Sequence, residues 1–218
     1  MVWVKSAYAE ELAVLAAWLS ALLPWSISVS LGEIQGGSLI EFHFPFLLIR
    51  VLFGIEVPGP NPLVMFPWEA IGFYSEAPGP LPFAAWTVGA AVIGLAVLLS
   101  LGMYAFEDRF ETSRLDPVRV MGGLLLVAAL FHTAASALLQ FGGLPIEGVA
   151  TDSFPGLLVP VGVVFQFAFA YTLLRVDRVD DPPEGASGAP PAETGDPTTP
   201  TAADGADAVG DDSPASGE

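Results

Sequence analysis

The sequence contains no cysteine. This absence excludes disulfide bonds, thiolate nucleophiles, cysteine-ligated iron–sulfur clusters and cysteine-type zinc sites. Basic residues are also few: the 218 residues include 7 Lys and Arg against 24 Asp and Glu, which gives a net charge of −17. Nucleic-acid binding depends on clustered Lys and Arg that displace counterions from phosphates, so we expect no nucleic-acid partner.

Charged residues of either sign are scarce. They make up 14% of the chain, whereas hydrophobic residues make up 53% and the mean hydropathy is +0.60. Soluble globular domains contain about 25% charged residues. A single soluble domain of this length would need more polar surface, so the composition predicts an integral membrane protein with the lipid bilayer as its first partner.

Four charge-poor windows are long enough to cross a bilayer, for which a helix needs about 20 apolar residues. They predict an all-α membrane protein, a four-helix transmembrane bundle with a small extracellular β-hairpin. A further apolar run, residues 44–55, is short and has Arg50 in its middle, so we interpret it as an interfacial or loop-packed segment. The expected spans are residues 7–25, 81–106, 120–141 and 154–174.

The basic residues indicate the orientation of this bundle, because cytoplasmic loops retain Lys and Arg. With four spans, Arg50 alone lies outside, and both termini are expected in the cytoplasm of a multi-pass cell-membrane protein. The basic residues expected on the cytoplasmic side are Lys5, Arg109, Arg114, Arg119, Arg175 and Arg178.

The loop between the first two spans, residues 26–80, is long enough to be structured. Residues 26–33 alternate between serine and aliphatic side chains, and Gly36-Gly37 is typical of a two-residue hairpin turn. A turn at this pair places Leu31 opposite Phe42 and Ser30 opposite His43. We expect the apolar side chains to form the buried face of the hairpin.

Residues 179–218 have a different composition, with ten acids, seven Pro, six Gly and no basic or aromatic residue. Such a segment cannot bury enough apolar surface to offset the entropy of ordering. The sequence therefore predicts that residues 1–178 form the membrane domain and that residues 179–218 form a disordered acidic cytoplasmic tail.

One polar stripe runs along the third predicted span. His132, Ser136 and Gln140 are four residues apart, and counting from the basic residues at the span ends places Gln166 and Ser20 at a depth similar to that of His132. Intramembrane ionisable residues mark functional sites, but a neutral imidazole also joins helices by hydrogen bonds. His132 is therefore a candidate either for interhelical packing or for proton relay or ligand contact.

No catalytic constellation, metal-ligand spacing or cofactor motif is present, so no catalytic residue, metal or cofactor is expected. The acids outside the spans could in principle hold a hard cation together with His43, but no ligand spacing recurs among them. We interpret them as solvated surface groups. They are Glu33, Glu41, Glu56, Glu69, Glu76, Glu147 and Asp152.

Several short motifs resemble a family of uncharacterised multi-spanning membrane proteins of halophilic archaea. They are Met-Val-Trp-Val-Lys-Ser at residues 1–6, Leu-Ser-Ala-Leu-Leu-Pro-Trp at 19–25, Gly-Gly-Ser at 36–38 and Phe-Pro-Phe at 44–46. The excess of acids in residues 1–178, 14 against 7 bases, fits a salty cytoplasm, where charge repulsion is screened. The resemblance implies a membrane location and no established activity.

Two functions fit these features. We favour a non-enzymatic membrane protein whose outer hairpin loop interacts with the cell envelope or with another membrane protein. The alternative is a small transporter, channel or proton-coupled sensor that uses His132. The sequence indicates neither a transported species nor an oligomeric state.

Overall fold

The structure is a computed structural model that describes residues 2–34, 36–54, 56, 59–76, 79–105, 116–142 and 153–179. The described helices are α1 (Ser6–Leu22), α2 (Pro67–Phe73), α3 (Leu81–Ala105), α5 (Pro117–Phe141) and α6 (Val161–Arg175). The described strands are β1 (Val2–Lys5), β2 (Ser26–Ile34), β3 (Gly37–His43), β4 (Leu48–Phe53), β5 (Leu63–Met65), β6 (Leu157–Val159) and β7 (Val176–Val179).

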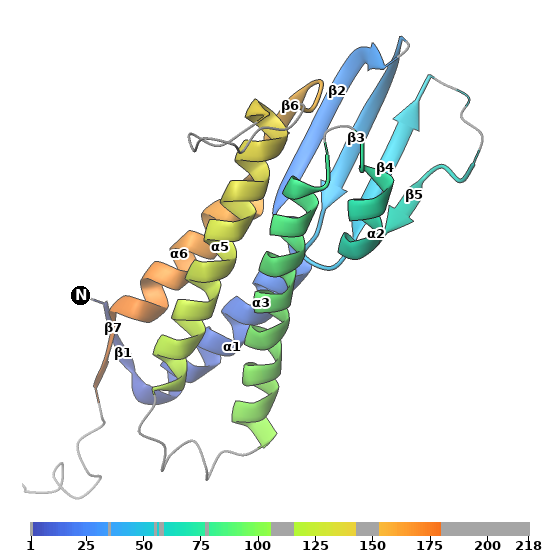
Figure 1. Ribbon diagram of the computed structural model, residues 1–218. Coiled ribbons are helices and arrows are strands. Elements are labelled where there is room, and N and C mark those ends of the chain that lie inside the picture. Colours follow the sequence, from blue (N-terminus) through green and yellow to red (C-terminus); the bar gives the residue numbers. More distant parts are fainter. Residues whose placement is uncertain are drawn as a thin grey trace, which may run out of the picture. The chain divides into compact units, whose positions relative to one another are not determined.

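Helices α1, α3, α5 and α6 pack together, and small residues allow their close approach (Figure 1). Ala9, Ala13, Ala16 and Ala17 are buried along one face of α1, at the spacing of successive helical turns. At Gly122 of α5, an added Cβ would lie 3.0 Å from side-chain atoms of α6. Asp116 caps the start of α5, and Gly142 ends that helix in the left-handed conformation, as expected from its glycine.

The second layer is a five-stranded antiparallel sheet in the order β5-β4-β3-β2-β6 (Figure 1). Four of its strands lie between α1 and α3 in the sequence, and the fifth, β6, lies between α5 and α6. A separate parallel pair joins β1 to β7. The edge strand β6 is therefore more than a hundred residues away in the sequence from β2, the strand with which it pairs.

The all-α fold class is wrong. The described residues form a mixed α and β structure with five helices and a five-stranded sheet, rather than a four-helix bundle with a small hairpin. The predicted hairpin exists as β2 and β3, but residues 48–53, interpreted as a loop-packed segment, form its neighbour β4. Local hydropathy cannot predict which distant segments pair as strands, so the pairing of β4 with β3 and of β6 with β2 was missed.

Two helices within the described residues, α3 and α5, are long and apolar enough to cross a membrane, and α6 is a shorter apolar helix. The predicted spans 81–106 and 120–141 correspond to these two long helices. Helix α1 ends at Leu22 rather than at residue 25, and α6 starts at Val161 rather than at residue 154, because residues 157–159 form β6. The predicted acidic tail lies outside the described residues apart from its first residue, Val179.

Candidate functional site

Trp25 joins three elements at the end of α1. Its backbone N–H donates to the carbonyl oxygen of His43 at 2.7 Å, and its own carbonyl oxygen accepts from the N–H of Gly162 at 3.2 Å. A Cβ at Gly162 would lie 2.3 Å from the carbonyl oxygen of Pro24, so the start of α6 can approach this closely only with glycine. The backbone thus fixes Trp25 between β3 and α6.

The indole of Trp25 contacts two buried histidines, one from the sheet and one from the helices. The His132 ring is stacked on it, with centroids 5.2 Å apart and planes 5° apart. The His43 ring lies at the same centroid distance with a tilt of 49°. Trp86 of α3 lies beside both Trp25 and His43, and its Nε1–H donates to the carbonyl oxygen of Phe44 at 3.0 Å. These rings connect the sheet to α3 and α5.

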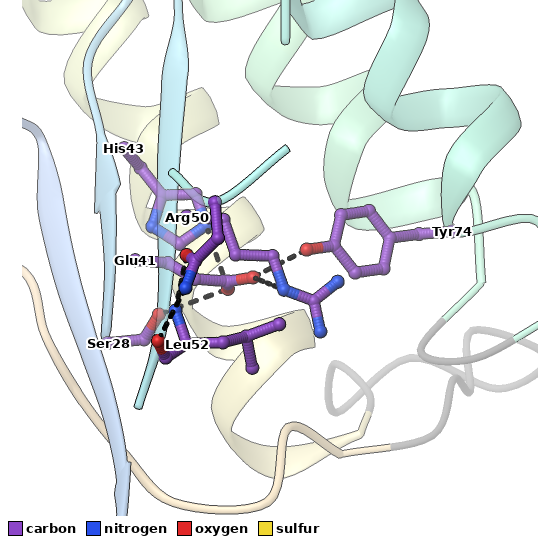
Figure 2. A network of polar contacts seen from close by, with 7 residues as sticks. Ser28, Glu41, His43, Arg50, Leu52 and Tyr74 are labelled. Carbon is purple, nitrogen blue, oxygen red and sulfur yellow. Dashed lines mark hydrogen bonds and ion pairs between the residues drawn. The ribbon is translucent and has the colours of Figure 1, made fainter. Parts of the chain in front are cut away.

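A buried carboxylate, that of Glu41, lies beside His43 on the same face of the sheet (Figure 2). The Tyr74 hydroxyl donates to Glu41 Oε1 at 2.5 Å, and the Ser28 hydroxyl donates to Glu41 Oε2 at 3.3 Å. Arg50 Nε lies 3.7 Å from Oε1, and His43 Nε2 lies 3.7 Å from Oε2. Four elements or their ends, β2, β3, β4 and the end of α2, therefore supply groups around one side chain.

Burial controls the ionisation of this cluster. It raises the pKa of the Glu41 carboxyl, opposed by the Tyr74 hydrogen bond and by the nearby Arg50 charge. It also raises the pKa of Tyr74 well above 10.0, with the neighbouring Glu41 acting in the same direction. Burial lowers the pKa of His43 to about 3, so this imidazole is neutral at physiological pH. Two neutral groups, the Tyr74 hydroxyl and the His43 imidazole, therefore lie around the Glu41–Arg50 ion pair.

The structure brings together some residues of the predicted polar stripe. His132 Nδ1 and Gln166 Oε1 are 2.9 Å apart in a buried pair between α5 and α6. Ser20 and Ser136 are buried, but their hydroxyls have no hydrogen-bond partner among the described residues. Gln140 is used elsewhere: its side chain accepts from the N–H of Leu158 at 2.7 Å and so holds β6.

The interpretation of Glu41 and His43 as solvated surface groups is wrong. Their exposed fractions are 3% and 1%. Glu56, Glu69 and Glu76 are exposed as expected, whereas Glu147 and Asp152 lie outside the described residues, as does the side chain of Glu33. Within the part of the chain that the structure describes, no three acids or histidines gather into a metal-binding group.

The two faces of the sheet are inverted relative to the prediction. The face toward the helices, which we call the inner face, carries the polar side chains of the hairpin. Among its members Ser26, Ser28 and Ser30 are buried with Glu41 and His43. Hydrogen bonds within the cluster make this burial tolerable for Ser28 and Glu41.

The opposite face, which we call the outer face, is apolar apart from Ser38. Phe53, Val64 and Leu157 on it are more than half exposed, and its central members are partly exposed. Directly paired residues share a face, so the strand register defines the set. The outer face consists of Ile27, Val29, Ser38, Ile40, Phe42, Ile49, Val51, Phe53, Val64, Leu157 and Val159.

The predicted hairpin register is also wrong. His43 pairs with Ser26 instead of Ser30, and Phe42 pairs with Ile27 instead of Leu31. Ile34 pairs with Gly37, so the turn comes one residue earlier than a turn centred on Gly36-Gly37. A bulge between Ser30 and Ile34 adds the remaining shift. Because the total shift is even, residues that were expected to share a face still do so.

Comparison with known proteins gives a family but no activity. No curated protein matches the chain. The family model described as "Family of unknown function (DUF7549)" matches residues 2–178. Since the match covers most of the chain, including every described helix and all of the five-stranded sheet, the protein belongs to this family of unknown function.

Proposed function

We propose that the protein is an integral membrane protein that presents its five-stranded sheet outside the cytoplasm and binds another membrane or envelope protein through the outer face. In this proposal it is a binding protein rather than an enzyme. The observation that carries the proposal is the apolar outer face, because a solvent-facing sheet normally turns its polar side outward.

The surfaces of the helices support a lipid environment. Only 33% of the most apolar window of α3, and 44% of that of α5, is buried. A core helix of a soluble protein would be mostly buried, whereas a helix in lipid can expose apolar side chains at no cost. Large apolar residues are exposed on all four long helices, among them Leu15, Leu22, Leu95, Leu98, Leu130, Val164 and Phe165.

Charges on the long helices support the orientation. Helix α3 has no charged residue, and the others carry charge only near the ends remote from the sheet, at Glu10, Glu11, Arg119 and Arg175. Arg50 is the basic residue of the sheet. Since Lys and Arg are retained in the cytoplasm, the sheet is on the opposite side and both termini are cytoplasmic.

An aromatic pair suits the boundary between sheet and bilayer. Phe66 and Trp68, at the start of α2, stack with centroids 4.8 Å apart, and their exposed fractions are 47% and 62%. Tryptophan favours the headgroup region, where an apolar ring can carry a polar N–H. In the proposed arrangement this pair anchors the start of α2 at the membrane surface.

The orientation can be tested by single-cysteine labelling, for which the cysteine-free sequence is well suited. Ser38→Cys is expected to react with an impermeant thiol reagent in intact cells. Ser113→Cys, outside the described residues, is expected to react only after lysis. Labelling of residue 113 in intact cells would overturn the proposed topology.

Binding through the outer face can be tested by site-specific photo-crosslinking in intact cells. A photoreactive residue at Val64 is expected to give a discrete adduct. The control is a photoreactive residue at Tyr104, exposed at the C-terminal end of α3, which should not give this adduct. Val51→Lys on the outer face should remove the Val64 adduct. A folded protein that gives no adduct from any outer-face position would refute the binding role.

The acid excess also supports a salty cytoplasm and an archaeal halophile as the source. Residues 1–178 carry 14 acids and 7 bases, and at about 1 M salt the screening length falls to about 3 Å. Thermal unfolding in 0.1 M and 2 M KCl is the test. A midpoint that is insensitive to KCl would remove this part of the proposal.

The transporter or sensor function centred on His132 has one observation in its favour. His132 Nε2 is buried and has no hydrogen-bond partner among the described residues. The other ring nitrogen, Nδ1, nevertheless contacts Gln166, and the ring stacks on Trp25, so these contacts hold the imidazole in a packed position. His132→Leu separates the two roles: a packing role lowers stability alone, whereas a transport role also removes a pH-dependent flux in proteoliposomes.

A further inference from the structure

A cavity of about 280 Å³ lies beside Arg50, between β4, the start of β5 and α2. The residues around it are mainly apolar, and Arg50 supplies the charge. Asn61 closes one side, because its side-chain amide binds both the N–H and the carbonyl oxygen of Leu52, at 3.0 and 2.8 Å. The lining residues are Arg50, Leu52, Gly59, Pro60, Asn61, Leu63 and Phe73.

Contacts with Glu41, Phe73 and Tyr74 hold the Arg50 guanidinium in place. Arg50 Nε lies 3.7 Å from Glu41 Oε1, and the guanidinium carbon lies 5.6 Å from the ring centre of Phe73 and 5.9 Å from that of Tyr74. Figure 2 shows the two terminal nitrogens of Arg50 directed away from Glu41. The side chain is 18% exposed, so its charge is largely withdrawn from water and fixed at the cavity wall.

The chemistry of this cavity selects its ligand. A planar guanidinium with two terminal nitrogens matches a carboxylate, which it binds through paired hydrogen bonds. The walls formed by Leu52, Leu63 and Phe73 favour an apolar body next to that carboxylate. The volume of about 280 Å³ corresponds to about nine water molecules at about 30 Å³ each, so a body of one ring or a short branched chain fits within it.

We infer that this cavity is a binding site for a small apolar carboxylic acid, with the carboxylate on the Arg50 guanidinium and the apolar body against Leu52, Leu63 and Phe73. This site is separate from the outer face, since Arg50 and Leu52 alternate with Val51 along β4 and so point to the other side of the sheet. The inference does not depend on the proposed protein partner.

Benzoate is a suitable probe, because it combines a carboxylate with a single apolar ring. Its binding to the full-length protein in detergent can be measured by ligand-observed NMR relaxation, with empty micelles as the blank. Benzoate is expected to bind, and benzamide, which has the same shape without the charge, is expected to bind at least about tenfold more weakly. Acetate, which has the charge without the ring, is expected to be weaker as well.

Two substitutions locate the binding. Arg50→Gln removes the charge and should weaken benzoate binding at least about tenfold, whereas the exposed and distant Arg119→Gln should leave it unchanged. Leu52→Trp fills the cavity while it keeps the guanidinium, so it should also abolish binding and decides the matter if Arg50→Gln does not fold. Absence of benzoate binding to the folded wild type, or equal binding by the wild type and a folded Arg50→Gln or Leu52→Trp variant, would overturn the inference.

Discussion

At the residue scale, His43 shows how neighbours decide the role of a side chain. Its ring is 1% exposed between Trp25 and Trp86, whereas Phe42, the next residue, lies on the partly exposed outer face. The side chain that looks polar and peripheral in the sequence is therefore part of the core, and the apolar one is at the surface.

This inversion predicts the order of two alanine substitutions. His43→Ala should lower the free energy of unfolding by about 3 kcal/mol, because it removes a buried ring and leaves a cavity. Phe42→Ala should cost about 1 kcal/mol, because less of its surface is withdrawn from solvent. Denaturant unfolding in detergent measures both free energies. A larger loss for Phe42→Ala would show that Phe42, and not His43, lies on the buried face of the sheet.

The buried imidazole also predicts a dependence of stability on pH. The folded-state pKa of His43 is about 3, below the ordinary value of 6.5. Between these values the unfolded chain binds a proton that the folded protein does not, so stability is lost as the pH falls from 6.5 toward 3, by up to about 1.4 kcal/mol per pH unit. His43→Gln should flatten this part of the stability profile.

Glu41 contributes with the opposite sign, which provides a control. Its pKa is raised above 4.5 in the folded state, so the folded protein binds the extra proton and stability falls as the pH rises through the window above 4.5. Relative to the wild type, Glu41→Gln should therefore gain stability with rising pH. Parallel profiles for the wild type and both variants would show that neither group is buried as described.

At the scale of elements, the contact between α3 and α5 depends on a glycine beneath a histidine. A Cβ at Gly89 would lie 2.6 Å from His132 Nε2 and 2.7 Å from its Cδ2, and the ring cannot move freely because it also stacks on Trp25. The absence of a side chain at Gly89 therefore makes room for the imidazole between the two helices.

Gly89→Ala should therefore lower the free energy of unfolding by about 1–3 kcal/mol through overpacking. Gly123→Ala in α5 is the matched control, because nothing lies within 4 Å of its added Cβ, and helix propensity alone should make it neutral or stabilising by up to about 1 kcal/mol. In a double-mutant cycle, His132→Ala should relieve most of the Gly89→Ala cost. Equal effects of the two glycine substitutions would contradict the described contact.

The same scale separates what the sequence can predict from what it cannot. The long helices, the glycine that ends α5 and the two strands of the hairpin follow from local patterns, because hydropathy and turn residues act over a few positions. Counting residues from the basic residues at the span ends also predicts that Gln166 lies at the same depth as His132, and the two side chains are in contact.

Features set by distant contacts were not predictable in this way. The strand at Leu157–Val159 looked like the opening of a span because its apolar residues carry no mark of their partner β2. Glu41 looked solvated because its hydrogen-bond donors, Ser28 and Tyr74, lie 13 and 33 residues away. The sheet faces were predicted the wrong way round because apolar side chains were assumed to face inward, whereas the inner face carries Glu41 with its hydrogen-bonding partners Ser28 and Tyr74.

At the scale of the molecule, the sheet and the helices share one core. A buried cluster combines Leu48 and Met65 of the sheet with Trp86 of α3, Leu139 of α5 and Val163 of α6. The sheet is also completed by β6, which the chain reaches only after α5. The residues between α1 and α3 are therefore a layer of a single folded unit and not a loop domain that folds separately.

This shared core predicts that residues 26–76, expressed alone, do not fold. The fragment contains β2 to β5 and α2. It lacks β6, the Trp86 and Leu139 side chains that share a buried cluster with Leu48, and the Trp25 and Trp86 rings that contact His43. His43 would lose its tryptophan neighbours, and a sheet whose inner face is covered by α2 alone has too little buried surface to offset chain entropy. The amide proton spectrum should show the narrow dispersion of an unfolded chain.

The control is the chain ending at residue 180, which retains both layers and should unfold in one cooperative transition. A dispersed spectrum and a cooperative transition for residues 26–76 alone would show that the sheet is an independent domain carried by the helices, because its stability would then owe nothing to α3, α5 or α6.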